Sequence, residues 1–292
     1  MPARPRQPTA RARQLAAEMR QLRETSMLTG EEVAVRLNWS ASKVSRIETA
    51  RISIAPADLR SLLDLYEVSG SQRARLVELG RTAKERGWWD AYTRTLREGY
   101  STLIALENDA ESERYYAAAI VPGLLQTQSY AQEIISTSVV VIPKGEIERQ
   151  VLVRMKRQGI LTKDNPIEFI VILDEAALRR QVGGAQVMRE QLLHLVQLTN
   201  RPNITMHVVP FATGSHPAMQ GAFAILQFPD ASASSTVFLE NMTSDLIVED
   251  EREVHQYGLV FDRLLELALG QNESMTMISQ IANEIDNEAE VN

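Results

Sequence analysis

The hydrophobic positions in the first part of the chain recur at helical spacing, in short segments that polar residues separate. Residues 29–48 resolve into two such segments. In the first, Val33 and Leu37 lie four residues apart and share one helix face. In the second, Val44 and Ile47 lie three apart and turn toward the same core. The spacing predicts two short helices packed against each other.

Capping signals delimit these two helices. Thr29 and Glu32 have the spacing of a capping box at the start of the first helix. Asn38 stands between the helices, and asparagine tolerates the left-handed backbone of a sharp turn. Ser40 is predicted to cap the second helix by accepting from the backbone N–H near Lys43. The pattern therefore specifies where each helix begins and how the chain turns between them.

The second helix is predicted to present a polar outer surface with short side chains. Trp39 and Val44 occupy the two positions of a hydrophobic staple, which fixes how the chain enters this helix. The residues that then face outward are Ala41, Ser42, Ser45 and Arg46. Because these side chains are short near the helix start, the backbone can approach the floor of a DNA groove. The alternative interpretation is an ordinary pair of surface helices with a solvated arginine.

Each outward side chain suits a different contact with double-stranded DNA. Arg46 can reach guanine O6 and N7 in bidentate fashion, the commonest specific contact in the major groove. Ser42 and Ser45 can bond to several base edges and specify less, whereas Lys43, on the flank, is predicted to pair with phosphate. Three further residues complete the predicted DNA-binding set: Thr29, Ser40 and Arg51.

Residues 29–48 resemble the helix-turn-helix of the XRE family of phage-repressor-like regulators. The resemblance implies an all-α domain over residues 10–85, with helices near 10–25, 29–37, 41–49, 56–67 and 71–86. It also implies an ion pair between Arg23 and Glu48. Three residues depart from the family pattern: Gly30 replaces a phosphate-contacting glutamine, Ala50 replaces a glycine after the recognition helix, and Ala55 replaces a serine cap before Pro56.

Charge divides the chain into a basic part and an acidic part. Residues 1–97 carry 18 Lys and Arg against 11 Asp and Glu, a net charge of +7. The remaining residues carry 13 against 27, a net charge of −14. The basic part suits a polyanion, and the acidic part would be repelled by DNA. Residues 1–9, with three prolines and two arginines, are predicted to be a disordered arm.

Beyond residue 85 the pattern changes to alternating strand-like and helix-like segments. Residues 86–99 form a junction in which Trp88 and Trp89 either cover a ligand or hold the two parts together. Residues 100–292 are predicted to form an α/β domain, a mixed sheet with flanking helices. The predicted strands are 167–173, 204–209, 222–228, 236–240 and 246–248, with a weaker one at 115–121. The predicted helices are 127–136, 145–160, 186–198, 252–269 and 273–287.

Two apolar stripes near the end of the chain bear on association. One consists of Val254, Tyr257, Gly258, Phe261, Leu264, Leu265 and Ala268, and the other of Met275, Ile278, Ala282 and Ile285. Either stripe could cover the predicted sheet, or it could form a homodimer or partner surface. A dimer would suit a DNA reader, because two half-sites one helical turn apart give more affinity than one.

Motifs along the second part resemble actinobacterial antitoxin-like regulators related to WhiJ. They include Val-Pro-Gly-Leu-Leu-Gln-Thr at 121–127, Leu-Asp-Glu-Ala-Ala-Leu-Arg-Arg at 173–180 and His-Pro-Ala-Met-Gln-Gly at 216–221. The resemblance implies a transcriptional regulator whose C-terminal domain has unknown function. It also implies a possible small protein partner encoded nearby.

Little in the second part indicates chemistry. The chain has no cysteine, and its four histidines lack the close spacing that metal sites favour, so no metal and no cofactor are expected. Asp174 and Glu175 could form an acid/base pair at a strand end, or could simply start a helix. Residues 214–221 could close over a ligand or only connect two elements. We therefore expect a protein that is not an enzyme.

The sequence favours a sequence-specific DNA-binding transcriptional regulator, dimeric and cytoplasmic, that binds an operator and does not enter a membrane. Its second domain would sense a small protein partner or a small-molecule effector of unknown identity. The alternative is an antitoxin-like interaction protein that sequesters a small partner and binds DNA for autoregulation.

Overall fold

The computed structural model describes residues 10–83, 87–92, 96–137, 143–229, 235–241 and 244–291. The chain divides into two compact units, Met1–Ala91 and Tyr92–Asn292. This division falls within the predicted junction of residues 86–99, and the predicted arm of residues 1–9 lies outside the described residues. Each unit encloses a hydrophobic core of its own.

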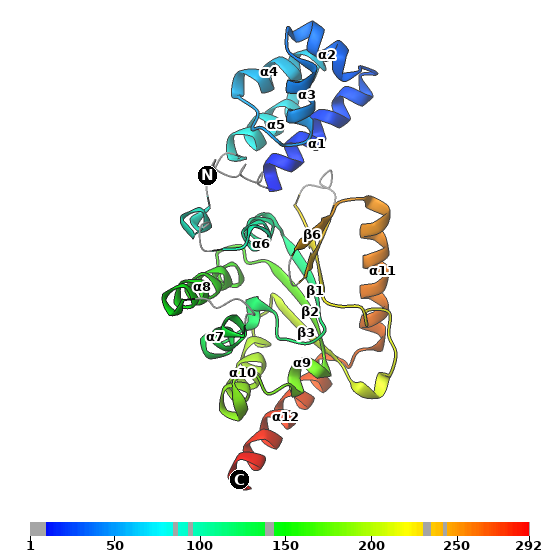
Figure 1. The fold of residues 1–292 in the computed structure, drawn as a ribbon. Coiled ribbons are helices and arrows are strands. Elements are labelled where there is room, and N and C mark those ends of the chain that lie inside the picture. Colours follow the sequence, from blue (N-terminus) through cyan, green and yellow to red (C-terminus); the bar gives the residue numbers. More distant parts are fainter. Residues whose placement is uncertain are drawn as a thin grey trace. The chain divides into compact units, whose positions relative to one another are not determined.

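The N-terminal unit is all-α (Figure 1). Its helices are Ala10–Thr25 (α1), Gly30–Leu37 (α2), Ala41–Glu48 (α3), Pro56–Leu65 (α4) and Gly70–Thr82 (α5), followed by a 3₁₀ turn at Trp88–Tyr92. These are the five predicted helices; the predicted end of the fifth, residues 84–86, lies outside the described residues. Their inward faces share one core, which includes Met19, Val33, Val44, Ile47, Leu63 and Leu76.

Four helices of this unit end at a residue that has a left-handed backbone without being glycine. The φ angles are 55° at Met27, 56° at Asn38, 53° at Ala50 and 56° at Glu67. After Met27, Asn38 and Glu67, the next N–H bonds to a carbonyl five residues earlier, as in the Schellman motif. The prediction for Asn38 is confirmed, because the side chain there suits the turn. Met27, Ala50 and Glu67 have side chains that do not favour this conformation.

The C-terminal unit is built on a six-stranded mixed sheet, which confirms the predicted α/β fold class. Its strands are Ser112–Ala117 (β1), Glu168–Asp174 (β2), Ile204–Val209 (β3), Phe223–Gln227 (β4), Thr236–Glu240 (β5) and Asp245–Val248 (β6). They lie in the order β3-β2-β1-β4-β5-β6. The first three strands are parallel, and β4, β5 and β6 join antiparallel to their neighbours.

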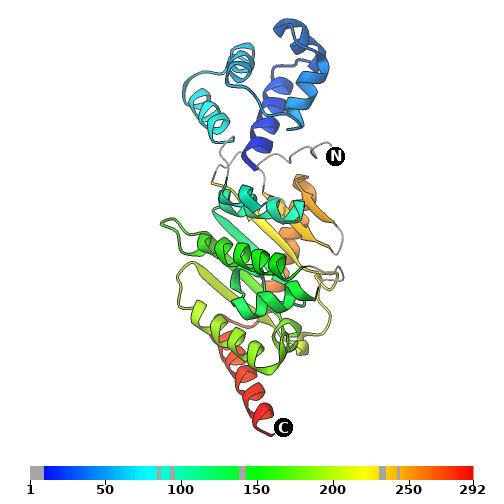
Figure 2. The ribbon, with the colours of Figure 1, turned by 60° about the vertical axis from the view of Figure 1, so that its left-hand side comes forward.

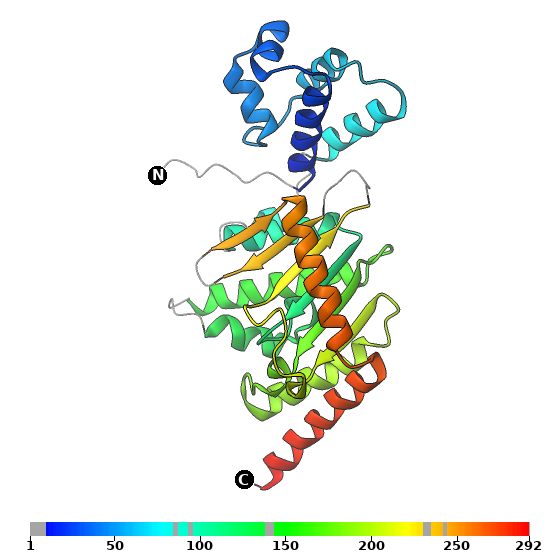
Figure 3. The same cartoon turned by 90° about the vertical axis from the view of Figure 1, so that its right-hand side faces the viewer.

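Helices cover both faces of this sheet. They are Glu98–Asp109 (α6), Gln128–Ser136 (α7), Lys144–Arg157 (α8), Glu175–Arg179 (α9), Gly184–Leu198 (α10), Glu251–Leu267 (α11) and Gln271–Val291 (α12). Figure 2 shows the green helices α7, α8 and α10 in front of the strands, and Figure 3 shows α11 crossing the opposite face. Helix α12 packs against α10 and β3. Because β1, β2 and β3 are connected through helices, parallel pairing is possible there.

The two apolar stripes that could have formed a dimer surface are largely used within the chain. Phe261 and Leu264 of α11 lie in the core between that helix and the sheet, with Tyr116 of β1. Ile278 and Ala282 of α12 are fully buried. The stripes therefore cover the sheet and α10.

The connection between α11 and α12 also closes one edge of the sheet. The Leu269 N–H donates to the Val208 carbonyl at 2.8 Å, and the Val208 N–H donates to the Ser274 hydroxyl at 3.0 Å. Strand β6 forms the opposite edge and pairs only with β5 among the described residues.

One predicted strand was misplaced and one long helix was missed. The strand predicted at 115–121 is Ser112–Ala117 instead. Its polar first half hid it, because Glu113 is buried against a charged partner from a helix and Arg114 lies over the Phe261 ring. Helix α6 was not predicted, and it packs against β6, which comes much later in the sequence. The single-turn α9 begins at Asp174 and Glu175, where a helix start was one of the two interpretations of the sequence.

Candidate nucleic-acid interface

The start of α2 is held by the predicted capping box. The Glu32 N–H donates to the Thr29 hydroxyl at 3.2 Å, and the Thr29 N–H donates to the Glu32 carboxylate at 2.8 Å. This backbone hydrogen bond is the main reason that the pKa of Glu32 is lowered. The Thr29 hydroxyl also donates to Glu32 at 2.9 Å, so a phosphate contact by Thr29 would have to compete with it.

The turn and the cap of α3 follow the sequence prediction. Asn38 has φ 56° and ψ 45°, and the Trp39 N–H returns to the Ala34 carbonyl at 2.8 Å. The Ser40 hydroxyl accepts from the Lys43 N–H at 3.1 Å. Trp39 packs against the core that contains Val44, as the staple predicts. The local sequence therefore determines how α3 leaves α2.

The outer face of α3 is accessible. Ala41, Ser42, Ser45 and Arg46 are exposed, while Val44 and Ile47 are buried. The Arg46 Nε donates to the Ser42 carbonyl one turn earlier, at 3.1 Å. This bond directs the side chain along the helix toward its N-terminal end, the end that HTH proteins insert toward base edges. Ser40 and Arg51 are exposed as well.

Lys43, which is predicted to contact phosphate, has an acidic and an aromatic neighbour that the local sequence does not reveal. Its Nζ lies 2.9 Å from Oδ1 of Asp58 in α4 and 3.7 Å from the centroid of the Trp39 ring. The sequence prediction had assigned this ammonium to a phosphate. Asp58 was not predicted as part of the site, because it lies 15 residues away and only the packing of α4 brings it close.

A second ion pair fastens the end of α3 to α1. The Arg23 Nε and Nη2 donate to the two Glu48 oxygens at 2.7 and 3.0 Å, and Nη1 donates to the Leu28 carbonyl at 2.9 Å. The hydrogen bond to Glu48 raises the pKa of Arg23. Burial, and then the charge of Glu48, raises the pKa of nearby Tyr66 to about 12. The ion pair that the XRE resemblance implies is present.

The three departures from the family pattern have visible consequences. Gly30 is the first residue of α2 and offers no side chain. Ala50 keeps the left-handed backbone that glycine would adopt without strain. Ala55 provides no side-chain cap for α4, although Pro56 at the first helical position partly compensates. Helix α4 nevertheless begins where the family pattern places it.

Basic residues from α2 to α4 fall into two groups. All of residues 29–69 are described, and of their five basic side chains only Lys43 forms an ion pair. The other four are exposed, and no carboxylate of the described residues lies within ion-pair distance of them: Arg36, Arg46, Arg51 and Arg60. Arg36 and Arg60 were not singled out from the sequence. Their signal was the surplus of positive charge, which does not show which arginines remain unpaired.

Comparison with protein families agrees with the two units. A model described as a helix-turn-helix domain matches residues 14–76, and a model of a domain of unknown function, DUF5753, matches residues 100–280. The second match covers more than half of the chain. The chain belongs to the DUF5753 family. No curated protein and no solved structure was found to match the chain.

Within the DUF5753 unit, Asp174 has a structural role. Its Oδ1 accepts from the Ala176 N–H at 2.8 Å, so it caps α9, as the helix-start interpretation of Asp174 and Glu175 predicts. Its Oδ2 accepts from the Tyr116 hydroxyl at 3.2 Å, and His216 Nε2 lies 3.4 Å away. Burial, and then the Asp174 charge, raises the pKa of Tyr116. His216 thereby anchors the loop of residues 214–221 to the sheet.

A charged cluster is buried between α6, β1 and α8 of the same unit. Arg157 forms a bidentate pair with Glu107, in which Nε lies 2.5 Å from Oε2. Glu113 lies beside this pair, and neither of its carboxylate oxygens has a hydrogen-bond partner. Burial first, and then the charge of Glu107, raises the pKa of Glu113 well above its usual value. Burial therefore favours the protonated form of Glu113 over its carboxylate.

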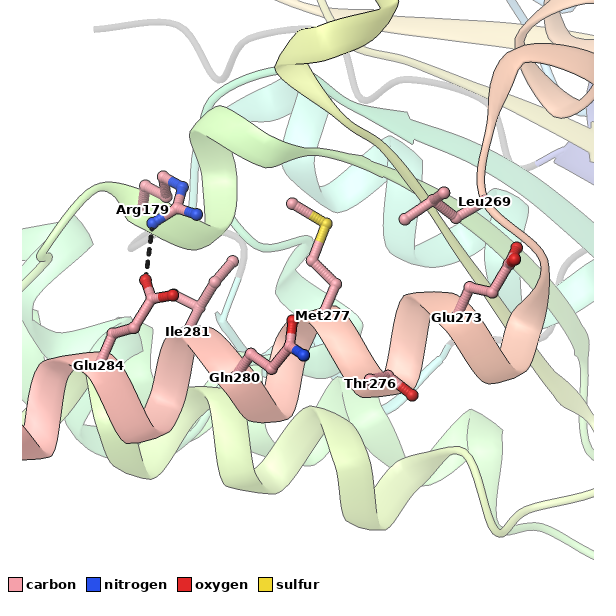
Figure 4. A pocket seen from close by; sticks show the side chains of 8 residues that line it. All are labelled: Arg179, Leu269, Glu273, Thr276, Met277, Gln280, Ile281 and Glu284. Carbon is pink, nitrogen blue, oxygen red and sulfur yellow. Dashed lines mark hydrogen bonds and ion pairs between the residues drawn. The ribbon is translucent and has the colours of Figure 1, made fainter.

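A shallow groove of about 370 Å³ runs between α9 and α12 (Figure 4). Arg179 and Glu284 form an ion pair of 3.0 Å beside it, and the side chains of Met277 and Ile281 line it. Its volume lies within the usual range for small-molecule sites.

The described residues hold no group of three or more His, Asp or Glu that could bind a metal ion. Among the helices described, none combines the length and apolar character needed to cross a bilayer.

Proposed function

We propose that this protein is a sequence-specific DNA-binding transcriptional regulator whose α3 enters the major groove of an operator. The observation that carries this proposal is the exposed outer face of α3, where short side chains surround Arg46. A helix with such a face can approach the groove floor, and an arginine there can read guanine. The match to a helix-turn-helix domain supports the same function.

The arrangement of charge supports this function. Arg36, Arg51 and Arg60 are exposed without ion-pair partners, so they are the side chains that we expect to contact phosphates. Residues 1–97 carry a net charge of +7, which favours association with a polyanion. Binding should weaken as salt rises, because phosphate contacts release counterions.

The direct test is footprinting of the protein on its own upstream region, followed by titration at fixed salt. Arg46→Ala should weaken specific binding by about 1–3 kcal/mol and relax the preference at one base position. Arg20→Ala is the matched control, because Arg20 is in α1, also exposed, and paired with Glu24. If both variants bound the operator as tightly as the wild type, α3 would not be the reading helix.

In the same proposal the DUF5753 unit acts as a regulatory module, not an enzyme. The groove beside Arg179 is where we would look first for a small-molecule effector. Homodimerisation would use surfaces that remain open, such as the outer face of α11, where Leu259 is 56% exposed, and the free edge of β6. Light scattering at several concentrations tests the dimer. Turnover of a substrate by this unit would contradict the regulatory role.

The second candidate is an antitoxin-like interaction protein that acts in the cytoplasm. The resemblance to WhiJ-related regulators and the net charge of −14 beyond residue 97 favour it, because an acidic surface suits a basic protein partner. In that case the product of a neighbouring short reading frame should co-purify with the full chain. The complex should be lost when residues 92–292 are deleted.

A further inference from the structure

The basic side chains from α2 to α4 are not equivalent, although the sequence presents them as one positive surface. Arg36, Arg46, Arg51 and Arg60 are exposed and have no ion-pair partner. Lys43 is half-buried, and its side chain is 29% exposed against 26% for its partner Asp58. A charge that must contact phosphate is expected to be free before DNA arrives. Lys43 does not meet that condition.

The side chain of Lys43 is held from two sides. Its Nζ lies 2.9 Å from Asp58 Oδ1 and 3.7 Å from the centroid of the Trp39 ring. A compact ammonium in that position gains from the carboxylate and from the negative face of the indole at once. These three residues are called the Lys43 cluster below. To reach a phosphate, Lys43 would have to give up both contacts.

The backbone of Lys43 is also fixed. Its N–H is the donor that the Ser40 hydroxyl accepts at the start of α3. Both the backbone and the side chain of Lys43 are therefore held. Through Trp39, Lys43 contacts the turn before α3, and through Asp58 it contacts the first turn of α4. The Lys43 cluster therefore fixes the end of α3 that we propose to enter the groove.

The acidic partner has a consequence for DNA binding. Asp58 is close to the start of α3, so a bare carboxylate there would repel the phosphates that flank the groove. Lys43 neutralises this charge within the protein. The pair therefore adds no net charge to the surface that faces DNA.

We propose that Lys43 is a positioning residue: it fixes α3 against α4 and neutralises Asp58, and it does not contact phosphate in the complex. This inference rests on the proposed function. It predicts that Lys43 and Asp58 act as one unit, whereas a phosphate contact would act independently of Asp58.

Salt dependence separates the two roles. Each phosphate contact that is lost lowers the slope of log K against log salt by about 0.9. Because Lys43→Met alone leaves the Asp58 carboxylate bare, the decisive variant combines Lys43→Met with Asp58→Asn. This double variant removes both charges, so it should keep the wild-type slope. Asp58→Asn frees the ammonium, so it should steepen the slope by up to about 0.9 and strengthen binding to random DNA.

The experiment is a fluorescence-anisotropy titration of the full chain at several salt concentrations. The probes are the footprinted fragment and a random duplex of equal length. The variants are Lys43→Met, Asp58→Asn, the double variant and Arg36→Met, the last as the control for a free arginine. Lys43→Met and Asp58→Asn should each lower the ratio of specific to random affinity by about two- to fivefold. The double variant should lose no more than Lys43→Met alone.

The opposite pattern would overturn the inference. If the double variant Lys43→Met with Asp58→Asn flattened the slope as Arg36→Met does, and weakened both duplexes equally, Lys43 would be a phosphate contact. If the wild type bound neither duplex, the proposed function itself would be wrong.

Trp39 gives a reading of the cluster without DNA. Lys43→Met removes the ammonium from the indole, so it should shift the Trp39 emission of the free protein, and Asp58→Asn should do so as well. An emission that neither variant changed would show that the cluster does not form in solution.

Discussion

Two arginine–glutamate pairs, one in each unit, share a bidentate geometry but differ in their surroundings. Arg23 and Glu48 lie near the surface of the helix-turn-helix unit, with side chains 15% and 11% exposed. Arg157 and Glu107 lie inside the DUF5753 unit, 4% and 0% exposed. The first pair fastens one helix to another while keeping contact with water. The second has lost its hydration and depends on its partners to offset that loss.

This difference fits the proposed roles of the units. In the helix-turn-helix unit the basic residues of α2 to α4 are at the surface, and four of them are available to a polyanion. In the DUF5753 unit Arg157, Glu107 and Glu113 are enclosed in the interior, where a polyanion cannot reach them. Breaking the buried pair should therefore cost more than breaking the surface pair.

The largest effect is expected from Arg157→Met, which leaves the buried Glu107 carboxylate without its counter-charge. The free energy of unfolding of the DUF5753 unit should fall by about 3–5 kcal/mol. All three tryptophans lie in the other unit, so tryptophan emission reports that unit. In a urea titration, circular dichroism should show the DUF5753 unit unfolding at a lower urea concentration. The midpoint of the tryptophan emission transition should not change. Arg263→Met, which breaks an exposed pair, is the control and should cost less than about 1 kcal/mol.

Glu113→Gln should sharpen the comparison through pH. Burial raises the pKa of Glu113 in the folded protein above its pKa in the unfolded chain. The protonated side chain therefore contributes its full stabilisation at pH values below the unfolded-state pKa. This stabilisation is lost as the pH rises through the folded-state pKa. The wild-type unit should therefore lose stability toward alkaline pH, and the variant should be more stable there by about 1–3 kcal/mol. Urea unfolding from pH 4 to pH 9 measures this. Parallel pH curves for both proteins would contradict it.

Glu48→Gln tests the surface pair in the same way. Removing its charge should lower the free energy of unfolding of the helix-turn-helix unit by about 1–2 kcal/mol, because hydrogen bonds to charged groups are stronger than neutral ones. For this variant the tryptophan emission transition should move to a lower urea concentration. A loss as large as that of Arg157→Met would mean that burial does not explain the difference between the pairs.

The smallest effect is expected from Ala50→Gly. Ala50 adopts a left-handed backbone, which costs alanine about 1–2 kcal/mol. Glycine removes this strain, but it also loses more conformational entropy on folding, which offsets part of the stabilisation. The variant should raise the stability of the helix-turn-helix unit by about 0.5–1 kcal/mol. Ala57→Gly, at an exposed position in the first turn of α4, should instead lower it by up to about 1 kcal/mol. The same sign for both variants would contradict the left-handed turn.

Much of the candidate interface could be predicted from the sequence because its signals are local. The capping box of Thr29, the turn at Asn38 and the Ser40 cap each involve residues no more than five positions apart. The outward face of α3 follows from the inward positions of Val44 and Ile47. Local contacts of this kind do not depend on how distant segments fold.

The remaining features required contacts between distant residues. The pairing of Lys43 with Asp58 could not be predicted, because Asp58 comes from another helix. Strand β1 was misplaced because its polar residues are buried against helices, Glu113 beside Arg157 of α8 and Arg114 over Phe261 of α11. The stripes on α11 and α12 showed that apolar faces existed, but not what covered them.

The sequence by itself determined where the recognition helix begins, which residues it exposes, and that a basic helical unit precedes an acidic α/β unit. Only the tertiary structure decided which charges are free, which are paired and which are buried. The physical reason is that helix caps and periodicity act over a few residues of one chain segment. The fate of a charge depends on every group that folding brings within a few ångströms of it.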